Sequence, residues 1–151
     1  MSGLLINERP VDEQQFEVIA ALVAQTPELD QSFDVTEAHL RLQHDGLLLT
    51  AELDGAAVGF KIGYNRFKDG SYYSWLGAVL PEFRGHDVAQ QLLVYQEQWV
   101  KARGYTGIYV KTRNRFVGMR ILLAKNSYHQ VGLESQPDSA EHRLLHYKAL
   151  A

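Results

Sequence analysis

The spacing of hydrophobic residues divides the chain into helices and strands. Apolar side chains recur three or four positions apart in four segments, which predicts helices at residues 11–25, 33–43, 88–103 and 114–126. Alternating or continuous apolar runs predict strands at residues 3–7, 47–53, 56–67, 71–80, 105–112, 128–134 and 142–150. The predicted order is therefore β α α β β β α β α β β.

Short polar motifs mark where these segments begin, turn and end. Asp12 can cap the first helix, and Gly104 is suited to end the third. Asp54-Gly55 and Asp69-Gly70 are typical of two-residue hairpin turns. An antiparallel meander then leads through the third helix into a βαβ crossover. We expect a mixed α/β (α+β) fold, with a largely antiparallel sheet, helices on both of its faces and one domain over residues 1–151.

The composition narrows the class of protein. The 151 residues are 46% hydrophobic and 22% charged, as in ordinary globular domains. No cysteine is present, which excludes disulfides, thiolate metal sites and a cysteine nucleophile. The histidine spacings complete no three-ligand set, so we expect no metal site. No apolar run approaches the ~20 residues that span a bilayer, and the N-terminus does not read as a secretory signal. We therefore expect a cytoplasmic protein with no membrane partner.

Charge is unevenly distributed along the chain. Eleven acidic residues lie between positions 1 and 54, against Arg9 and Arg41 alone. Residues 84–125 instead hold eight Lys or Arg side chains against Asp87 and Glu97. Solvated helix faces would explain both blocks, and so would a protein that holds an anion in one place and a cation in another. The pI of about 6.0 argues against a nucleic-acid partner.

Residues 78–93 carry the most informative motif. The strand that ends near Leu80 leads through Arg84, Gly85 and His86 into the third helix. A helix N-terminus presents unpaired N–H groups and a partial positive charge, so it binds phosphate groups readily. Gly85 permits close approach of the backbone, and Arg84 adds a fixed cation. The motif therefore predicts an anion-binding turn.

This segment resembles the acyl-CoA-binding motif of the GNAT superfamily of N-acetyltransferases. The family pattern is Gln/Arg-x-x-Gly-x-Gly/Ala after a strand that often ends in Val-x-Pro. Here Val79-Leu80-Pro81 precedes Arg84-Gly85-His86-Asp87-Val88-Ala89. Asn114 follows the next strand and begins a helix that runs into Ser127-Tyr128, which is similar to the family's later region. The resemblance covers roughly residues 47–132.

The resemblance implies direct acyl transfer. Acetyl-CoA or another acyl-CoA would lie in a V-shaped split between the parallel strands 71–80 and 105–112, and an amine acceptor would attack its thioester with no covalent enzyme intermediate. The basic block would face the CoA phosphates, and the acidic N-terminal region would favour a cationic acceptor. The residues expected at acetyl-CoA are Ala78, Val79, Arg84, Gly85, His86, Asp87, Val88, Ala89 and Asn114.

Asp87 departs from the family motif, which has Gly at this position. One alternative is a capping box, in which Asp87 accepts the N–H of Gln90 and occupies part of the anion site. The other is a left-handed backbone at Asp87, with its side chain turned away. The first alternative predicts weaker CoA binding than in a relative with Gly.

A second departure concerns the catalytic groups. Many relatives place a Tyr five residues before the aromatic that follows the fourth helix, where it can protonate the CoA thiolate, and this chain has Leu123 there. Tyr128 is the candidate acid, with Tyr73, Tyr109 or a water as alternatives. Glu82 is the candidate base, with ordered water as its alternative.

Three functions stay open on the sequence. The leading hypothesis is an acyl-CoA-dependent N-acetyltransferase acting on a primary amine. Asp87 and Leu123 would also suit a non-catalytic module that binds CoA or a protein partner. The helix N-terminus would suit a general anion-binding domain. The C-terminal strands could, in addition, pair in a homodimer.

Overall fold

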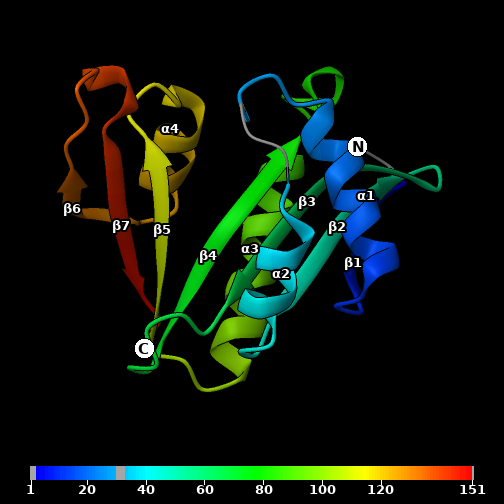
Figure 1. The fold of residues 1–151 in the computed structure, drawn as a ribbon, viewed down its shortest axis with the longest axis horizontal. Coiled ribbons are helices and arrows are strands. Elements are labelled where there is room, and N and C mark those ends of the chain that lie inside the picture. The colour runs from blue at the N-terminus through cyan, green and yellow to red at the C-terminus, as the bar shows by residue number, and fades with distance from the viewer. Residues whose placement is uncertain (1–2, 30–32, 151) are drawn as a thin grey trace.

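The order of strands and helices is the predicted one. The computed structural model describes residues 3–29 and 33–150. Its elements are β1 (Leu4–Arg9), α1 (Glu13–Ala24), α2 (Val35–Leu42), β2 (Leu47–Leu53), β3 (Ala56–Tyr64), β4 (Ser71–Val79), α3 (Val88–Ala102), β5 (Gly107–Arg113), α4 (Val117–Lys125), β6 (His129–Glu134) and β7 (Arg143–Ala149) (Figure 1). Two 3₁₀ helices, Pro81–Phe83 and Ser139–Glu141, fall outside the prediction because three residues are too few to show a period. None of the helices in these ranges is long and apolar enough to cross a membrane.

A seven-stranded sheet carries the fold, in the order β1-β2-β3-β4-β5-β7-β6. Its neighbouring strands are antiparallel except β4 and β5, which run parallel because α3 crosses over between them. β4 and β5 pair only between Ser71–Ser74 and Gly107–Val110, and above that point they diverge (Figure 1). The predicted mixed fold, with a largely antiparallel sheet and a βαβ crossover, is confirmed.

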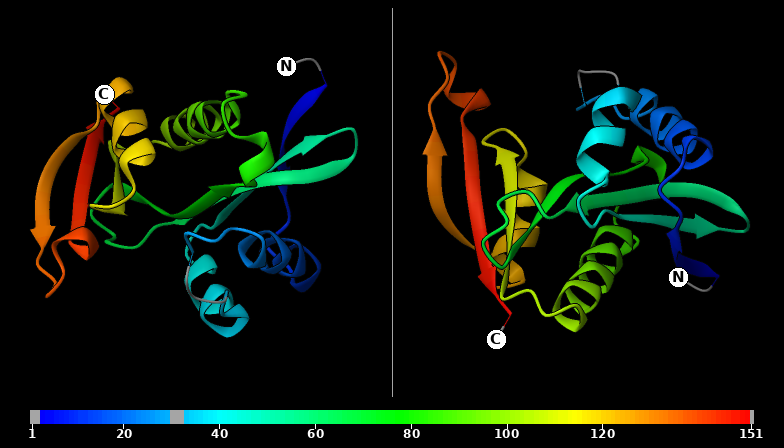
Figure 2. Two further views of the ribbon diagram at one scale, coloured as in Figure 1. Left: turned by 90° about the horizontal axis from the view of Figure 1, so that it is seen from above. Right: turned by 60° about the horizontal axis from the view of Figure 1, so that its bottom comes forward.

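Helices cover both faces of the sheet. α1 and α2 lie on one face, and α3 and α4 lie on the other (Figure 2). Under α1 and α2, one buried cluster joins Phe16 and Ile19 to Phe60. Under α3 and α4, a second cluster joins Leu92 to Tyr72. The central strands bury both of their faces, which explains why β2 and β3 read as nearly continuous apolar runs in the sequence.

The predicted caps and turns were correct in all but one case. Asp12 accepts the N–H of Gln15 at 3.0 Å and caps α1. Asp54 and Gly55 both have positive φ, as a tight hairpin turn requires. Asp69-Gly70 is not a two-residue hairpin, since β3 already ends at Tyr64. The connection is a longer loop, in which the Asn65 side chain accepts the N–H of Lys68.

Candidate functional site

A cleft of about 1020 Å³ opens where β4 and β5 separate. The register between β3 and β4 shifts at Trp75, which stands as an extra residue in β4. Such a bulge bends the strand that carries it. Trp75 follows Ser74 directly, the last residue of β4 that pairs with β5. The bulge therefore accounts for the divergence of the two strands.

The cleft extends to both faces of the sheet. The beginning of α3 and part of α4 line it on one face, and the α1–α2 connection lines it on the other. Along its length, β4 after Ser74 has no strand beside it on the β5 side. The free N–H and C=O groups of that edge can pair with an extended ligand. Ala78 and Val79, two of the predicted cofactor residues, lie on this edge and line the cleft.

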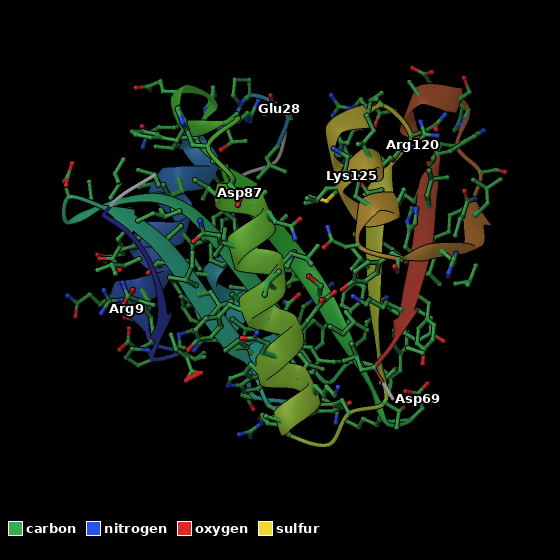
Figure 3. The ribbon with its side chains drawn as sticks, turned by 180° about the vertical axis from the view of Figure 1, so that it is seen from behind. Arg9, Glu28, Asp69, Asp87, Arg120 and Lys125 are labelled. Carbon is green, nitrogen blue, oxygen red and sulfur yellow. The ribbon has the colours of Figure 1, made fainter. Side chains whose placement is uncertain are left out.

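The N-terminus of α3 is open to the cleft. Gln91 makes the first backbone hydrogen bond of the helix, to the Asp87 carbonyl at 3.0 Å, so the N–H groups of residues 88–90 precede the helical pattern. The side chain of Asp87 makes no capping hydrogen bond, and its backbone is left-handed, with φ 68°. The capping-box alternative for Asp87 is therefore wrong. Figure 3 shows Asp87 at this end of α3.

Gly85 leaves open space beside the backbone of the same turn. Its φ of +81° is unfavourable for a side chain, and a Cβ there would meet no atom within 4 Å. Gly85, Asp87, Val88 and Ala89 all line the cleft, together with Arg84. His86 is exposed and lies outside the lining. Asn114 also lies outside it, and its side-chain amide donates to the Ser139 carbonyl at 3.2 Å.

Arg84 is held by a carboxylate at the mouth of the cleft. Its two terminal nitrogens donate to Glu28 at 2.6 and 2.7 Å, and its Nε donates to the Val79 carbonyl at 3.2 Å. This fork lowers the pKa of Glu28 from 4.5 to about 2. Arg115 reaches the backbone carbonyl of Glu28 at 3.2 Å. Glu28, above α3 in Figure 3, thus ties the α1–α2 connection to the phosphate-binding turn.

The two predicted catalytic residues do not line the cleft. Glu82 is exposed in the 3₁₀ helix and does not line it. Tyr128 is buried, and burial together with a hydrogen bond from its hydroxyl to Glu97 raises its pKa. That arrangement suits a structural side chain better than an acid. Of the alternatives, Tyr73 lines the cleft, on the face covered by α1 and α2.

Sequence reasoning missed Lys61, which lies in the middle of β3. It is only 7% exposed, yet it lines the cleft. Burial lowers its pKa from 10.5 to about 8, although Glu97 opposes the change. The signal was present in the sequence, because a lysine inside an apolar strand is unusual and Gly59 and Gly63 flank it on the same face of β3.

The two charge blocks do not map onto the cleft as two opposite walls. Several acids of the N-terminal region lie away from the cleft, as when Glu52 pairs with Arg9 at the far edge of the sheet. Among the described residues of that region, the acids that line the cleft are Glu28, Asp34 and Glu37. Glu37 forms an ion pair with Arg41, which also lines the cleft. The cleft is therefore mixed in charge on its α1–α2 side.

Solved structures share this fold. Ribosomal-protein-S18-alanine N-acetyltransferase from Escherichia coli has a TM-score of 0.83 at 10% identity, covering 98% of this chain and 94% of that one. An acetyltransferase of the GNAT family from Staphylococcus aureus Mu50 has a TM-score of 0.79 at 18% identity, with 98% and 99% covered. An aminoglycoside 6'-N-acetyltransferase complexed with coenzyme A has a TM-score of 0.76 at 15% identity, with 97% of both chains covered. At these identities the likeness concerns the fold.

A match to a sequence family is independent of this likeness. The family model described as the acetyltransferase (GNAT) family matches residues 14–125. That range runs from α1 to the end of α4 and contains the diverging strands, the turn at Arg84 and the open helix N-terminus. It covers more than half of the sequence, and the chain therefore belongs to the acetyltransferase (GNAT) family.

Proposed function

We propose that this protein transfers an acetyl or other acyl group from acyl-CoA to a primary amine by direct attack. Membership of the GNAT family supports acyl-CoA-dependent N-acyl transfer in general. One observation carries the proposal: an uncapped helix N-terminus and a free strand edge line the same cleft. The first suits a pyrophosphate, and the second suits the amide-bearing pantetheine arm.

The phosphate end of CoA would lie at the start of α3. The N–H groups of Val88 and Ala89 would donate to the pyrophosphate, and Gly85 would let it approach the backbone. Arg84 would exchange the two carboxylate oxygens of Glu28 for two oxygens of a phosphate group, keeping a bidentate partner. The pantetheine amides would pair with β4 around Ala78, so the thioester would point down the cleft toward Ser74.

The acceptor would reach the thioester from the side of α1 and α2. A cleft that holds both substrates supplies the alignment on which direct transfer depends. We assign removal of the amine proton to ordered water, since Glu82 lies outside the lining. No thiol is available for a covalent intermediate, because the chain has no cysteine.

The charge of the acceptor is the finer part of the proposal. A cationic acceptor would meet Asp34, whose carboxylate faces this side and accepts the N–H of Glu37. Arg66 lies on the same side, stacked over the Tyr73 ring at 4.7 Å. An amine that also carries a carboxylate would meet Arg66. Transfer rates toward a panel of polyamines, neutral amines and amino acids therefore distinguish a cationic acceptor from an amine that also carries a carboxylate.

Calorimetry with acetyl-CoA tests the cofactor site. Ala89→Glu places a carboxylate at the open end of α3, and we expect it to weaken binding at least about tenfold. Ala102→Glu is the matched control, because it adds the same charge at the far end of the same helix. Bound acetyl-CoA should also raise the melting temperature of the wild-type protein.

Release of free CoA in the presence of the amine panel tests the reaction. Acetyl-CoA binding without release of CoA for any amine would favour the non-catalytic module. Equal competition by inorganic phosphate and by CoA would favour a general anion-binding domain. Transfer to at least one primary amine class would support the proposed activity.

A further inference from the structure

Lys61 presents a buried cation to the cleft. Its position in β3 pairs with Gly77 of β4, and a Cβ on Gly77 would meet Lys61 Cγ at 3.4 Å. The aliphatic stem of the lysine therefore passes over Gly77, where β4 has no side chain. The side chain is 7% exposed and is part of the cleft lining. Gly77 thus provides the space through which Lys61 reaches the cleft.

No described residue neutralises this cation by direct contact. Within residues 3–29 and 33–150, no hydrogen bond or ion pair engages Lys61 Nζ. Glu97 on α3 is the charged group that acts on it, and Glu97 is already engaged by Lys148 at 3.0 and 3.1 Å and by the Tyr128 hydroxyl. At 7% exposure, an ammonium with no protein partner is poorly hydrated, so the site favours a ligand atom that carries negative charge.

The reacting end of acyl-CoA is the part of the ligand that comes nearest to Lys61. This step rests on the proposed function, in which the pantetheine amides pair near Ala78 and the phosphates lie at α3. Gly77 is the next residue along β4 from Ala78, toward Ser74 and the point of divergence. The sulfur and acyl carbon follow the pantetheine amides in that direction. Lys61 therefore flanks the place where negative charge develops on sulfur.

We propose that the ammonium group of Lys61 protonates the CoA sulfur as it leaves. The amine nitrogen bonds to the acyl carbon, the C–S bond breaks, and its electron pair goes to sulfur. Lys61 Nζ gives its proton to that sulfur and becomes neutral. The proton lost by the amine goes to water, and Lys61 recovers one from water. The products are the amide and CoA thiol.

The surroundings agree with this role. Leu123 occupies the position at which many relatives have a tyrosine, and it is fully buried and cannot donate a proton. The Tyr128 hydroxyl is committed to Glu97. Burial lowers the pKa of Lys61 to about 8, close to the value of about 8.5 for an ordinary cysteine thiol. Proton transfer between groups of similar pKa is efficient near neutral pH.

Binding of CoA and of desulfo-CoA, which lacks the sulfur, tests the proposal without turnover. We expect the wild-type protein to bind CoA about tenfold more tightly than desulfo-CoA at pH 8, because only CoA offers the ammonium a sulfur partner. Lys61→Met keeps the length of the stem and should bind both ligands equally. Lys101→Met, at the exposed last turn of α3, is the matched control and should keep the preference.

The outcomes separate this proposal from the proposed function. Equal affinity of the wild-type protein for CoA and desulfo-CoA would overturn the role of Lys61 and leave acyl transfer standing. Failure to bind either ligand would overturn both. Lys61→Gln is the second variant if Lys61→Met does not fold, and the same equality is expected. In turnover, either variant should lower kcat about 100-fold with little change in the KM for acetyl-CoA, and a change in KM alone would overturn the proposal.

Discussion

The cations at the mouth of the cleft, where Arg84 lies, and on its floor, where Lys61 lies, differ in exposure and in pairing. At the mouth, the side chain of Arg84 is 44% exposed and already has a bidentate carboxylate partner. On the floor, Lys61 is 7% exposed, and Glu97, the carboxylate that acts on its charge, is already paired with Lys148. Exposed ion pairs contribute about 0–1 kcal/mol, whereas an unpaired buried charge costs several. Arg84 can therefore exchange its partner with a small change in free energy. Lys61 is stabilised most when a ligand places a negatively charged atom beside it.

Because of this difference, we expect Arg84 to affect the affinity for CoA and Lys61 to affect the chemical step. A phosphate that displaces Glu28 from Arg84 replaces one exposed pair with another, so the mouth can capture and release CoA with a small free-energy change. The floor has no such substitute within the described residues. The charge of Lys61 acts where the bond to sulfur breaks. Removing that charge should therefore lower kcat and leave the binding of acetyl-CoA nearly unchanged.

Exchanging the type of cation at each position should give the largest contrast. Lys61→Arg keeps the charge but has a proton that is not released near neutral pH, so we expect kcat to fall about 100-fold. Arg84→Lys replaces a fork with a single point charge, and we expect the KM for acetyl-CoA to rise about threefold. Steady-state kinetics with one amine measures both. Similar losses in the two variants would remove the distinction between mouth and floor.

Asp87→Gly should strengthen CoA binding by a smaller factor. Although Asp87 caps nothing, it lines the cleft beside Val88 and Ala89, so its charge still opposes a bound phosphate. Two unit charges about 4 Å apart in water interact by about 1 kcal/mol, so removing this carboxylate should raise affinity about fivefold. The gain should shrink in high salt because the mouth is exposed. Asp54→Gly is the control, since Asp54 has a similar left-handed backbone, with φ 51°, in the hairpin between β2 and β3. Calorimetry at two salt concentrations would contradict the prediction if both variants behaved alike.

Local signals made the fold predictable. Caps, hairpin turns and periodic apolar faces act within a few residues, as in the Asp12 cap and the Asp54-Gly55 turn. The prediction extended β3 to residue 67 because Phe67 resembles a continuation of the strand's apolar and aromatic residues. A hydrogen bond from the Lys68 N–H to the Asn65 side chain instead shapes residues 65–68 into a loop. That bond competes with the strand and leaves no periodic trace.

The site was only partly predictable, because its key contacts join distant segments. The turn from Arg84 to Ala89 could be read as a motif. The partner of Arg84 could not, since Glu28 lies 56 positions away. The bulge at Trp75 depends on the register between two strands. Lys61 could have been recognised as unusual in its strand, but its access to the cleft depends on Gly77 of the neighbouring strand.

Glu28→Gln should have the smallest effect and tests how freely the mouth exchanges partners. The change removes the anion that holds Arg84, so we expect CoA affinity to rise about twofold and stability at neutral pH to fall by less than about 1 kcal/mol. The pKa of Glu28 is lowered from 4.5 to about 2 in the folded protein, so its contribution is complete above about pH 4.5 and is lost as the pH falls toward 2. Urea unfolding should therefore show a gap between wild type and variant at pH 6 that closes in acid. Glu52→Gln, at the opposite edge of the sheet, is the control for affinity. A fall in CoA affinity for Glu28→Gln alone would mean that Glu28 orients Arg84 for phosphate rather than competing with it.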